Sequence, residues 1–209
     1  MAVHRWGVVV PLKLLDRAKT RLVVGDAHAR AELALAFAED VVAAALACPA
    51  VERVVVVTDD PRAAAALAGP RVVVEPDRPG TGLNPAIEHG ALGLAGLAVA
   101  ALAADLPALR PQELQAALVA VVHRGFVPDA GRAGTTLLAA VAGVALAPAY
   151  GLGSRRLHLD SGAVELAAGA TLRRDVDTLA DLEQALRLGV GARTAAALAG
   201  LVAGQPARG

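Results

Sequence analysis

Short runs of valine, leucine and alanine alternate with longer Ala- and Leu-rich segments in the first half of the chain. The runs predict buried β-strands at residues 6–12, 53–58, 71–75 and 97–104. The intervening segments predict helices at residues 27–48 after an Asp26 cap, at 61–69 and at 85–94. This alternation indicates βαβ units, and therefore a mostly parallel sheet with helices on both faces.

The second half of the chain has the same kinds of pattern in a less regular order. It predicts a helix at residues 111–122, strands at 125–128 and 135–141, a helix at 154–167, a strand at 171–176 and two C-terminal helices. Neither an internal repeat nor a linker-like stretch is visible. We therefore expect residues 1–209 to form one domain with a three-layer, doubly wound α/β fold.

Composition narrows the classes of partner. Twenty basic residues balance twenty acidic ones, so no overall field attracts nucleic acid or an anionic membrane, and any anion must be bound by a local cluster. The single cysteine, Cys48, excludes an intrachain disulfide framework. The most apolar stretch, residues 90–104, is shorter than the roughly 20 residues that a membrane span needs. We expect a cytoplasmic protein without nucleic-acid or membrane partners, whose oligomeric state the sequence leaves open.

The loop after the first predicted strand is strongly basic. Lys13, Arg17, Lys19 and Arg21 lie within nine residues, and both lysines of the chain are among them. A solvated basic face is one interpretation, but a loop at this place in a doubly wound fold also suits a triphosphate, whose charge needs neutralisation. The motifs of P-loop and dinucleotide-binding proteins are absent from the sequence.

Three aspartates form a candidate site for a hard cation. Asp105 directly follows the predicted strand at 97–104, at the edge where open α/β sheets bind ligands. Asp175 and Asp177 are two positions apart, so an extended backbone directs both carboxylates to one side. Alternatively Asp105 caps the next helix, and Asp177 or Thr178 caps the helix that follows, with Asp181 completing a capping box.

Two further segments are candidates for substrate contacts. Residues 79–85 form a Gly- and Pro-rich loop in which Gly82, Leu83 and Asn84 could contact a nucleobase or ribose, although Asn84 could equally cap a helix. An anion pocket is expected from hydroxyls, backbone amides and positive charge in the second half of the chain, at Thr135, Thr136, Gly151, Ser154, Arg155, Arg156 and His158. Each of these features also has a structural explanation, such as the start of a strand or a helix cap.

These motifs, taken in order, resemble the guanylyltransferases of coenzyme F420 biosynthesis, which activate 2-phospho-L-lactate or phosphoenolpyruvate with GTP. The similar elements run across nearly the whole chain: Pro11-x-Lys13, Ala18-Lys-Thr-Arg21-Leu, Thr58-Asp59, Gly80-x-Gly-Leu-Asn84, Ala104-Asp-Leu-Pro107, Pro128-Asp129, Gly134-Thr-Thr136, Gly151-x-Gly-Ser154 with His158, and Asp175-x-Asp177-Thr178. Pro79 and Thr81 depart from this pattern, since acidic residues are often expected there.

The resemblance implies a nucleotide-diphosphosugar-transferase-like fold and transfer of GMP to the phosphorylated acid with release of pyrophosphate. It implies that Mg²⁺ is held by Asp105, Asp175 and Asp177, and the acid by Thr136, Gly151 and Ser154. Lys13, Lys19 and Arg21 would then stabilise the departing pyrophosphate.

The alternatives are another nucleotidyltransferase of this fold or a non-catalytic nucleotide-binding regulator. Molybdenum-cofactor guanylyltransferases and the cytidylyltransferases of isoprenoid synthesis have a Gly-Gly-x-x-x-Arg first loop, which this sequence lacks. A regulator could lose metal carboxylates, whereas all three are present here. The sequence does not choose among phosphoenolpyruvate, 2-phospholactate and 3-phosphoglycerate. Its preference for arginine, alanine and glycine suggests a GC-rich genome, and phosphoenolpyruvate is favoured if that genome is actinobacterial.

Overall fold

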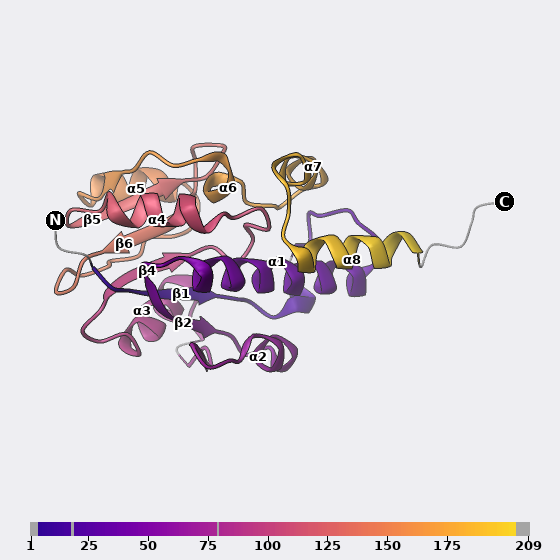
Figure 1. Ribbon diagram of the computed structural model, residues 1–209, viewed down its shortest axis with the longest axis horizontal. Coiled ribbons are helices and arrows are strands. Elements are labelled where there is room, and N and C mark those ends of the chain that lie inside the picture. The colour runs from indigo at the N-terminus through magenta and orange to yellow at the C-terminus, as the bar shows by residue number, and fades with distance from the viewer. Residues whose placement is uncertain (1–3, 18, 79, 204–209) are drawn as a thin grey trace.

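A computed structural model describes residues 4–17, 19–78 and 80–203, so that Ala18 and Pro79 of the sequence motifs lie outside the described residues. Seven strands form one sheet in the order β3-β2-β1-β4-β6-β5-β7. Only β6 runs against its neighbours, β4 and β5. The strands are β1 (Trp6–Pro11), β2 (Val51–Val57), β3 (Val72–Glu75), β4 (Ala98–Leu102), β5 (Arg124–Pro128), β6 (Thr135–Ala140) and β7 (Val164–Glu165). The predicted mostly parallel α/β sheet is confirmed (Figure 1).

Helices cover both faces of this sheet. They are α1 (Ala27–Ala47), α2 (Pro61–Leu67), α3 (Leu83–Leu92), α4 (Pro111–Val119), α5 (Ser154–Asp160), α6 (Ala170–Arg173), α7 (Leu179–Leu188) and α8 (Ala192–Ala203), with a short 3₁₀ helix, η1, at Leu15–Arg17. Val8 and Val10 of β1 belong to the core formed with α1 and α4, whereas Val9 belongs to the core formed with α3. Because successive strand side chains point to opposite faces, one valine run fills both layers.

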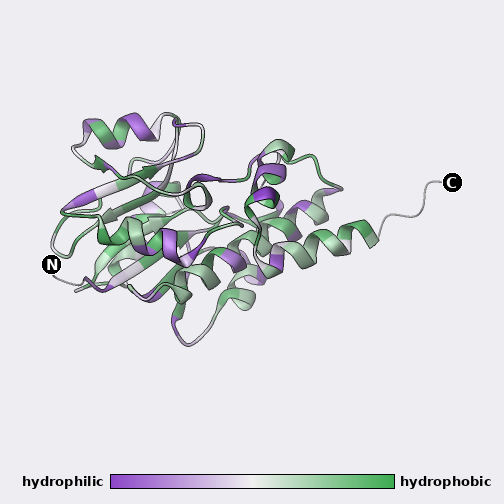
Figure 2. Cartoon of the chain, turned by 45° about the horizontal axis from the view of Figure 1, so that its top comes forward, coloured by the Kyte–Doolittle hydropathy of each residue, from purple (hydrophilic) through white to green (hydrophobic). Residues whose placement is uncertain are grey.

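Capping residues set the helix boundaries that the sequence predicts. The Asp26 carboxylate accepts the N–H of Ala29 at 2.9 Å and starts α1. Thr178 and Asp181 form a reciprocal capping box at the start of α7, as one of the sequence alternatives proposed. Figure 2 shows mainly hydrophobic colours along the strands, and most of the polar colours in parts of the helices and in loops.

Two predicted elements are wrong. The helix predicted at residues 154–167 ends at Asp160, because Gly162 takes a left-handed backbone (φ +83°) and the chain then forms β7. The strand predicted at 171–176 is instead the short helix α6 followed by an irregular segment without strand pairing. Glu113 of α4 accepts the N–H groups of Thr171 and Leu172, so a residue far away in the sequence stabilises the first turn of α6.

The C-terminal helices add a second, smaller core. Leu182 and Ala185 of α7 pack with Leu33 and Phe37 of α1, and α8 lies alongside α1 (Figure 1). No helix in the described part of the chain is both long and apolar enough to span a membrane.

Candidate functional site

A cavity of about 610 Å³ lies at the carboxyl ends of β1 and β4, beside the loops that precede β6 and α5. This position is the ligand-binding edge of an open α/β sheet, and the volume suits a small-molecule site. Most of the predicted site residues line it, namely Lys13, Lys19, Arg21, Leu83, Asp105, Thr136, Gly151, Ser154, Asp175 and Asp177. Gly82, Asn84 and His158 are not among the lining residues.

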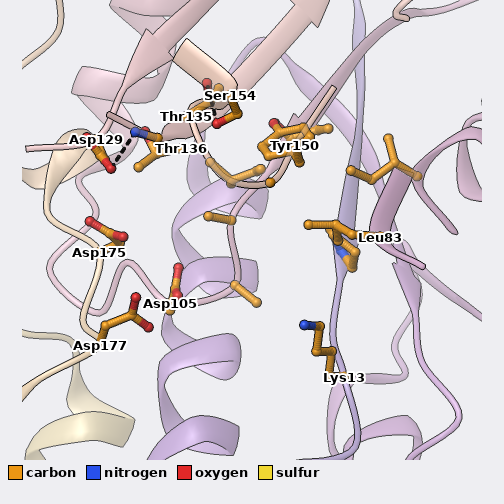
Figure 3. Close-up of a pocket in the computed structure, with 18 of the residues that line it drawn as sticks. Lys13, Leu83, Asp105, Asp129, Thr135, Thr136, Tyr150, Ser154, Asp175 and Asp177 are labelled. Carbon is orange, nitrogen blue, oxygen red and sulfur yellow. Dashed lines mark hydrogen bonds between the residues drawn. The ribbon is translucent and has the colours of Figure 1, made fainter. Parts of the chain in front are cut away.

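Lysine, hydroxyl and carboxylate side chains lie on different sides of the cavity. Figure 3 shows Lys13 at the end opposite Thr135 and Ser154, with Asp105 and Asp177 along a third side. Lys13 is exposed, and no hydrogen bond or ion pair joins it to another residue of the described ranges. It is therefore the cationic side chain at this site that an incoming anion could meet without breaking an existing ion pair.

Lys19 is the counter-ion of two aspartates that are far apart in the sequence. Its Nζ lies 2.5 Å from Asp105 Oδ2 and 3.1 Å from Asp177 Oδ1. Arg21 makes a second ion pair with Asp177. Burial alone would lower the pKa of Lys19, but the carboxylates of Asp105 and Asp177 outweigh that effect and raise it, so Lys19 is an ammonium ion at neutral pH.

Backbone contacts bring these aspartates together. The N–H of Val176 donates to the carbonyl oxygen of Asp105 at 3.0 Å, which fixes the segment before α7 against the end of β4. The capping box at Thr178 then fixes the chain directly after Asp177. Lys19 has a left-handed backbone (φ 55°), which is uncommon for a residue with a side chain.

Asp175 lies where negative charge is concentrated. Burial, and then the carboxylates of Asp105, Asp129 and Asp177, raise the pKa of Asp175 to about 7. Asp129 also lines the cavity, but its carboxylate accepts the N–H groups of Ala133 and Gly134 at 2.9 and 2.7 Å. Asp129 therefore shapes the turn before β6, a role that its position in the sequence Asp-Ala-Gly-Arg could have indicated.

The aspartates fit a divalent cation in chemistry and in charge. Two carboxylates contact one cationic atom, Lys19 Nζ, and a third is crowded by its neighbours, which is the environment that a hard cation relieves. Within the described ranges, however, no group of three or more carboxylate, imidazole or thiol side chains is arranged so that it could hold an ion directly. Lys19 contacts two of the three aspartates in this arrangement, so an ion would have to replace it.

Asn84 makes structural contacts rather than facing the cavity. It lies in the first turn of α3, which begins at Leu83 and not at Pro85 as predicted. Its side-chain oxygen accepts the N–H of Tyr150 at 2.7 Å, and its side-chain nitrogen donates to the Tyr150 carbonyl at 3.0 Å. Asn84 thus ties α3 to the loop that carries Gly151, while Leu83 beside it lines the cavity.

The predicted anion-pocket residues gather around the start of β6 and of α5. Thr136 is buried, and its hydroxyl donates to the Leu172 carbonyl at 2.7 Å. Ser154 is also buried and lies 3.3 Å from the Thr135 hydroxyl. His158 is fully enclosed, and its Nδ1 lies 2.9 Å from the hydroxyl of Thr135, which lines the cavity.

Sequence reasoning missed Tyr150 and Leu152 as cavity residues. Both line the cavity, and Leu152 is fully exposed between Gly151 (φ +137°) and Gly153 (φ +71°). An aromatic or aliphatic side chain beside glycines carries no distinct chemical signal, so only the folded loop identifies these two.

Comparison with known proteins agrees with the geometry. A phosphoenolpyruvate guanylyltransferase from Geodermatophilus obscurus is 56% identical over 211 aligned residues, covering 96% of this chain and 97% of that protein. One from Streptomyces coelicolor is 54% identical, covering 96% of this chain and 100% of that protein. A search of protein-family models gave no match.

Solved structures support the fold. A proposed nucleotide-diphospho-sugar transferase from Desulfovibrio desulfuricans G20 superimposes with a TM-score of 0.68 at 20% identity, covering 97% of this chain and 96% of that one. A nucleotidyl transferase from Methanothermobacter thermautotrophicus gives a TM-score of 0.62 at 19% identity, covering 88% of this chain and 98% of that one. The predicted nucleotide-diphosphosugar-transferase-like fold is thereby confirmed.

The fold, the placement of the aspartates beside a lysine-containing loop and the extent of the sequence identity agree, and this chain belongs to the phosphoenolpyruvate guanylyltransferase family.

Proposed function

We propose that the chain is a single nucleotidyltransferase domain that transfers GMP from GTP to phosphoenolpyruvate, or to 2-phospho-L-lactate, in coenzyme F420 biosynthesis. The single observation that carries this proposal is the convergence of Asp105 and Asp177 on one cationic centre at the edge of the sheet. The names of the relatives supply the substrate, since those that are 52–56% identical are phosphoenolpyruvate guanylyltransferases. A cytoplasmic location is part of the proposal, because GTP and phosphorylated acids are cytoplasmic metabolites.

The reaction needs no protein nucleophile. A phosphate oxygen of the acid attacks the α-phosphorus of GTP, a new P–O bond forms, and the bond from the α-phosphorus to the bridging oxygen breaks. Pyrophosphate leaves with that oxygen and its electron pair. Because the attacking phosphate is already anionic near pH 7, no general base is required, and catalysis depends on positioning and on neutralising charge.

Residues on different sides of the cavity would bind different parts of the two substrates. Lys13 would neutralise charge on the departing pyrophosphate. Lys19 and Arg21 would do so as well, once they are displaced from the aspartates. Asp105, Asp175 and Asp177 would hold Mg²⁺, which when bound supplies charge neutralisation to the phosphates. Leu83, with Gly82 at the preceding position, would border the nucleoside.

The phosphorylated acid would bind at the end of the cavity opposite Lys13. Thr136, Gly151 and Ser154 lie there, and His158 is behind them. The enclosed position of Ser154 excludes much of the competing water, which strengthens a hydrogen bond to an anion.

The test of the reaction is pyrophosphate release by the purified protein with Mg²⁺. GTP, CTP and ATP would each be combined with phosphoenolpyruvate, 2-phospholactate and 3-phosphoglycerate. We expect release with GTP and phosphoenolpyruvate or 2-phospholactate. Release with CTP or ATP in preference to GTP, or no release with any pair, would contradict the proposal.

The test of the cation site is Asp105→Asn, compared with Glu183→Gln on the exposed surface of α7. The amide has nearly the shape of the carboxylate but no charge, so we expect a loss of kcat on the order of 100-fold or more with an unchanged fold. Near-normal turnover in a folded Asp105→Asn protein would reject the assignment. Binding of Mn²⁺, followed by its paramagnetic signal, gives a measurement that does not depend on activity.

A further inference from the structure

His158 is the best-enclosed titratable side chain near the cavity. It lies on α5 with no exposed surface, between the rings of Phe126 and Tyr150. Its two ring nitrogens have different partners. Nε2 lies 3.0 Å from the backbone nitrogen of Ala149, and Nδ1 lies 2.9 Å from the Thr135 hydroxyl oxygen.

These partners fix where the imidazole proton lies. A backbone N–H can only donate, so Nε2 must accept from Ala149 with its lone pair. The proton of the neutral ring is therefore on Nδ1, and Nδ1–H donates to Thr135 Oγ1. Burial, and then the nearby Arg124 guanidinium, lower the pKa of His158 to about 4, so the ring is neutral at the pH of the reaction.

The hydroxyls of Thr135 and Ser154 together carry two hydrogens, and one of these remains available to donate to a ligand. Thr135 Oγ1 accepts from His158, so its own hydrogen must point elsewhere. Ser154 Oγ is 3.3 Å away, and one hydrogen can be shared between these two oxygens. The other hydroxyl hydrogen has no acceptor among the described residues, and both residues line the cavity.

The hydroxyl of Thr136 cannot supply such a donor, so any contact of Thr136 with the acid would use another group of this residue. Its hydroxyl hydrogen is directed to the Leu172 carbonyl, leaving lone pairs that an anion would repel. The adjacent Thr135 therefore carries the donor, although both threonines line the same cavity. Figure 3 shows Thr135 and Ser154 facing each other at the end of the cavity opposite Lys13.

We propose that the Thr135–Ser154 pair donates a hydrogen bond to an anionic oxygen of the phosphorylated acid, and that His158 is the positioning residue that fixes its direction. This inference rests on the proposed function, because it assigns the acid to this end of the cavity. It adds Thr135 to the residues that select the acid. It also gives His158 a role exerted through Thr135 and not by contact with the substrate.

The first test compares Thr135→Val with Thr135→Ser. Valine has the shape of threonine without the hydroxyl, so we expect the KM for the acid to rise about 10- to 100-fold, as for loss of a hydrogen bond to a charged group. The KM for GTP should change less than about twofold, and serine should restore most of the affinity for the acid. An unchanged KM for the acid, or an equal rise in both KM values, would overturn the proposal.

The second test uses His158 and remains decisive if Thr135→Val does not fold. Asparagine can place an amide N–H near the position of Nδ1 and so keep the donor to Thr135, whereas glutamine can place its oxygen near the position of Nε2 and keep only the acceptor for Ala149. We expect His158→Asn to retain a lower KM for the acid than His158→Gln. The reverse order, or equal values, would reject the positioning role.

Two probes then identify the anionic group that is bound, and separate this inference from the function on which it rests. Pyruvate carries only the carboxylate, and methyl phosphate carries only a phosphate. The inhibition constant of one of them against the acid should rise in Thr135→Val, and no rise for either would overturn the proposal.

Failure of the wild-type protein to release pyrophosphate would instead reject the proposed function. Isothermal titration of phosphoenolpyruvate onto wild type and Thr135→Val, where we expect a matching 10- to 100-fold loss of affinity, tests the subsite without turnover.

Discussion

Asp175 adds a negative charge to the cavity that no ion pair in the described part of the protein compensates. Its carboxyl group is near those of Asp105, Asp129 and Asp177, while Lys19 pairs with only two of them. Burying like charges together costs free energy of folding unless a cation lies between them. Such a cost is typical of a functional site, where residues are arranged for a ligand.

Replacing Asp175 with asparagine should therefore stabilise the metal-free protein and damage its activity. We expect the free energy of unfolding near pH 8 to rise by about 1–2 kcal/mol in the presence of a chelator, because one buried charge is removed. Denaturant unfolding with a chelator and with Mg²⁺ measures this change. Mg²⁺ should stabilise wild type more than Asp175→Asn, and equal stabilisation of the two would argue against a role of Asp175 in cation binding.

The buried imidazole of His158 makes a separate, pH-dependent contribution to stability. Its pKa is about 4 in the folded protein and near the ordinary value of 6.5 in the unfolded chain. The unfolded chain therefore binds this proton more readily, so the contribution is complete above pH 6.5 and is lost as the pH falls toward 4. We expect a loss of at most about 3 kcal/mol over this window.

Unfolding of wild type and His158→Asn between pH 4 and 7 measures that loss as the difference between their slopes. The carboxylates titrate in both proteins, so their contribution cancels to a first approximation. His28→Asn is the matched control, since His28 is exposed on α1. Parallel slopes for wild type and His158→Asn would contradict the enclosed, neutral imidazole.

The contact between α3 and the loop before α5 joins the two ends of the cavity. Asn84 makes both of its hydrogen bonds to the backbone of Tyr150, and Tyr150 in turn donates its hydroxyl to the Ala101 carbonyl of β4. The loop with Gly151 and Leu152 is therefore fixed from two elements.

Loss of this contact should affect the acid more than the nucleotide. We expect Asn84→Ala to raise the KM for the acid about tenfold, because two hydrogen bonds that order the loop are lost, and to change the KM for GTP less than about twofold. Glu88→Gln, on the exposed face of the same helix, is the control. If Asn84 instead contacts the nucleobase, as the sequence suggested, the KM for GTP would rise and the discrimination against ATP would fall.

For the chain as a whole, α8 completes the smaller core through one buried carboxylate. Asp40 of α1 accepts the N–H groups of Arg193 and Thr194 at 3.0 and 2.9 Å, and so caps α8 from another helix. Gly191 precedes α8, and a Cβ at that position would collide with the Asp40 carboxylate. The position of α8 over α1 thus depends on a pair of residues that are distant in the sequence.

Asp40→Ala should lower the stability of the protein by about 1–3 kcal/mol, because it leaves the buried N–H of Thr194 and the partly buried N–H of Arg193 without an acceptor. Thermal unfolding measures the loss, and kcat at low temperature should stay near that of wild type because Asp40 is not among the cavity-lining residues. Glu39→Ala is the matched control, since Glu39 makes only a 3.7 Å ion pair, with Arg193, among the residues that the structure describes. Equal stability of Asp40→Ala and Glu39→Ala would reject the capping role.

Local sequence signals were sufficient for most of the sheet and for the identity of the candidate site. The valine runs, the Asp26 cap and the Thr178–Asp181 capping box predicted their elements correctly, because strand burial and helix capping depend on residues close in the chain. The same reasoning proposed Asp105, Asp175 and Asp177 as partners. It failed at residues 171–176, where Glu113 stabilises a helical turn from 58 residues away.

Only the tertiary structure determined how the site residues contact one another. Lys19 reaches Asp105 across 86 positions and Asp177 across 158, and no local pattern encodes such a meeting. The tertiary structure likewise places Asn84 against Tyr150 and encloses His158 behind Thr135. The sequence specifies which chemical groups are present and which segments become helices and strands, because these follow from short-range preferences. The direction and partner of each polar side chain follow from the packing of distant segments, and that packing decides what each group can bind.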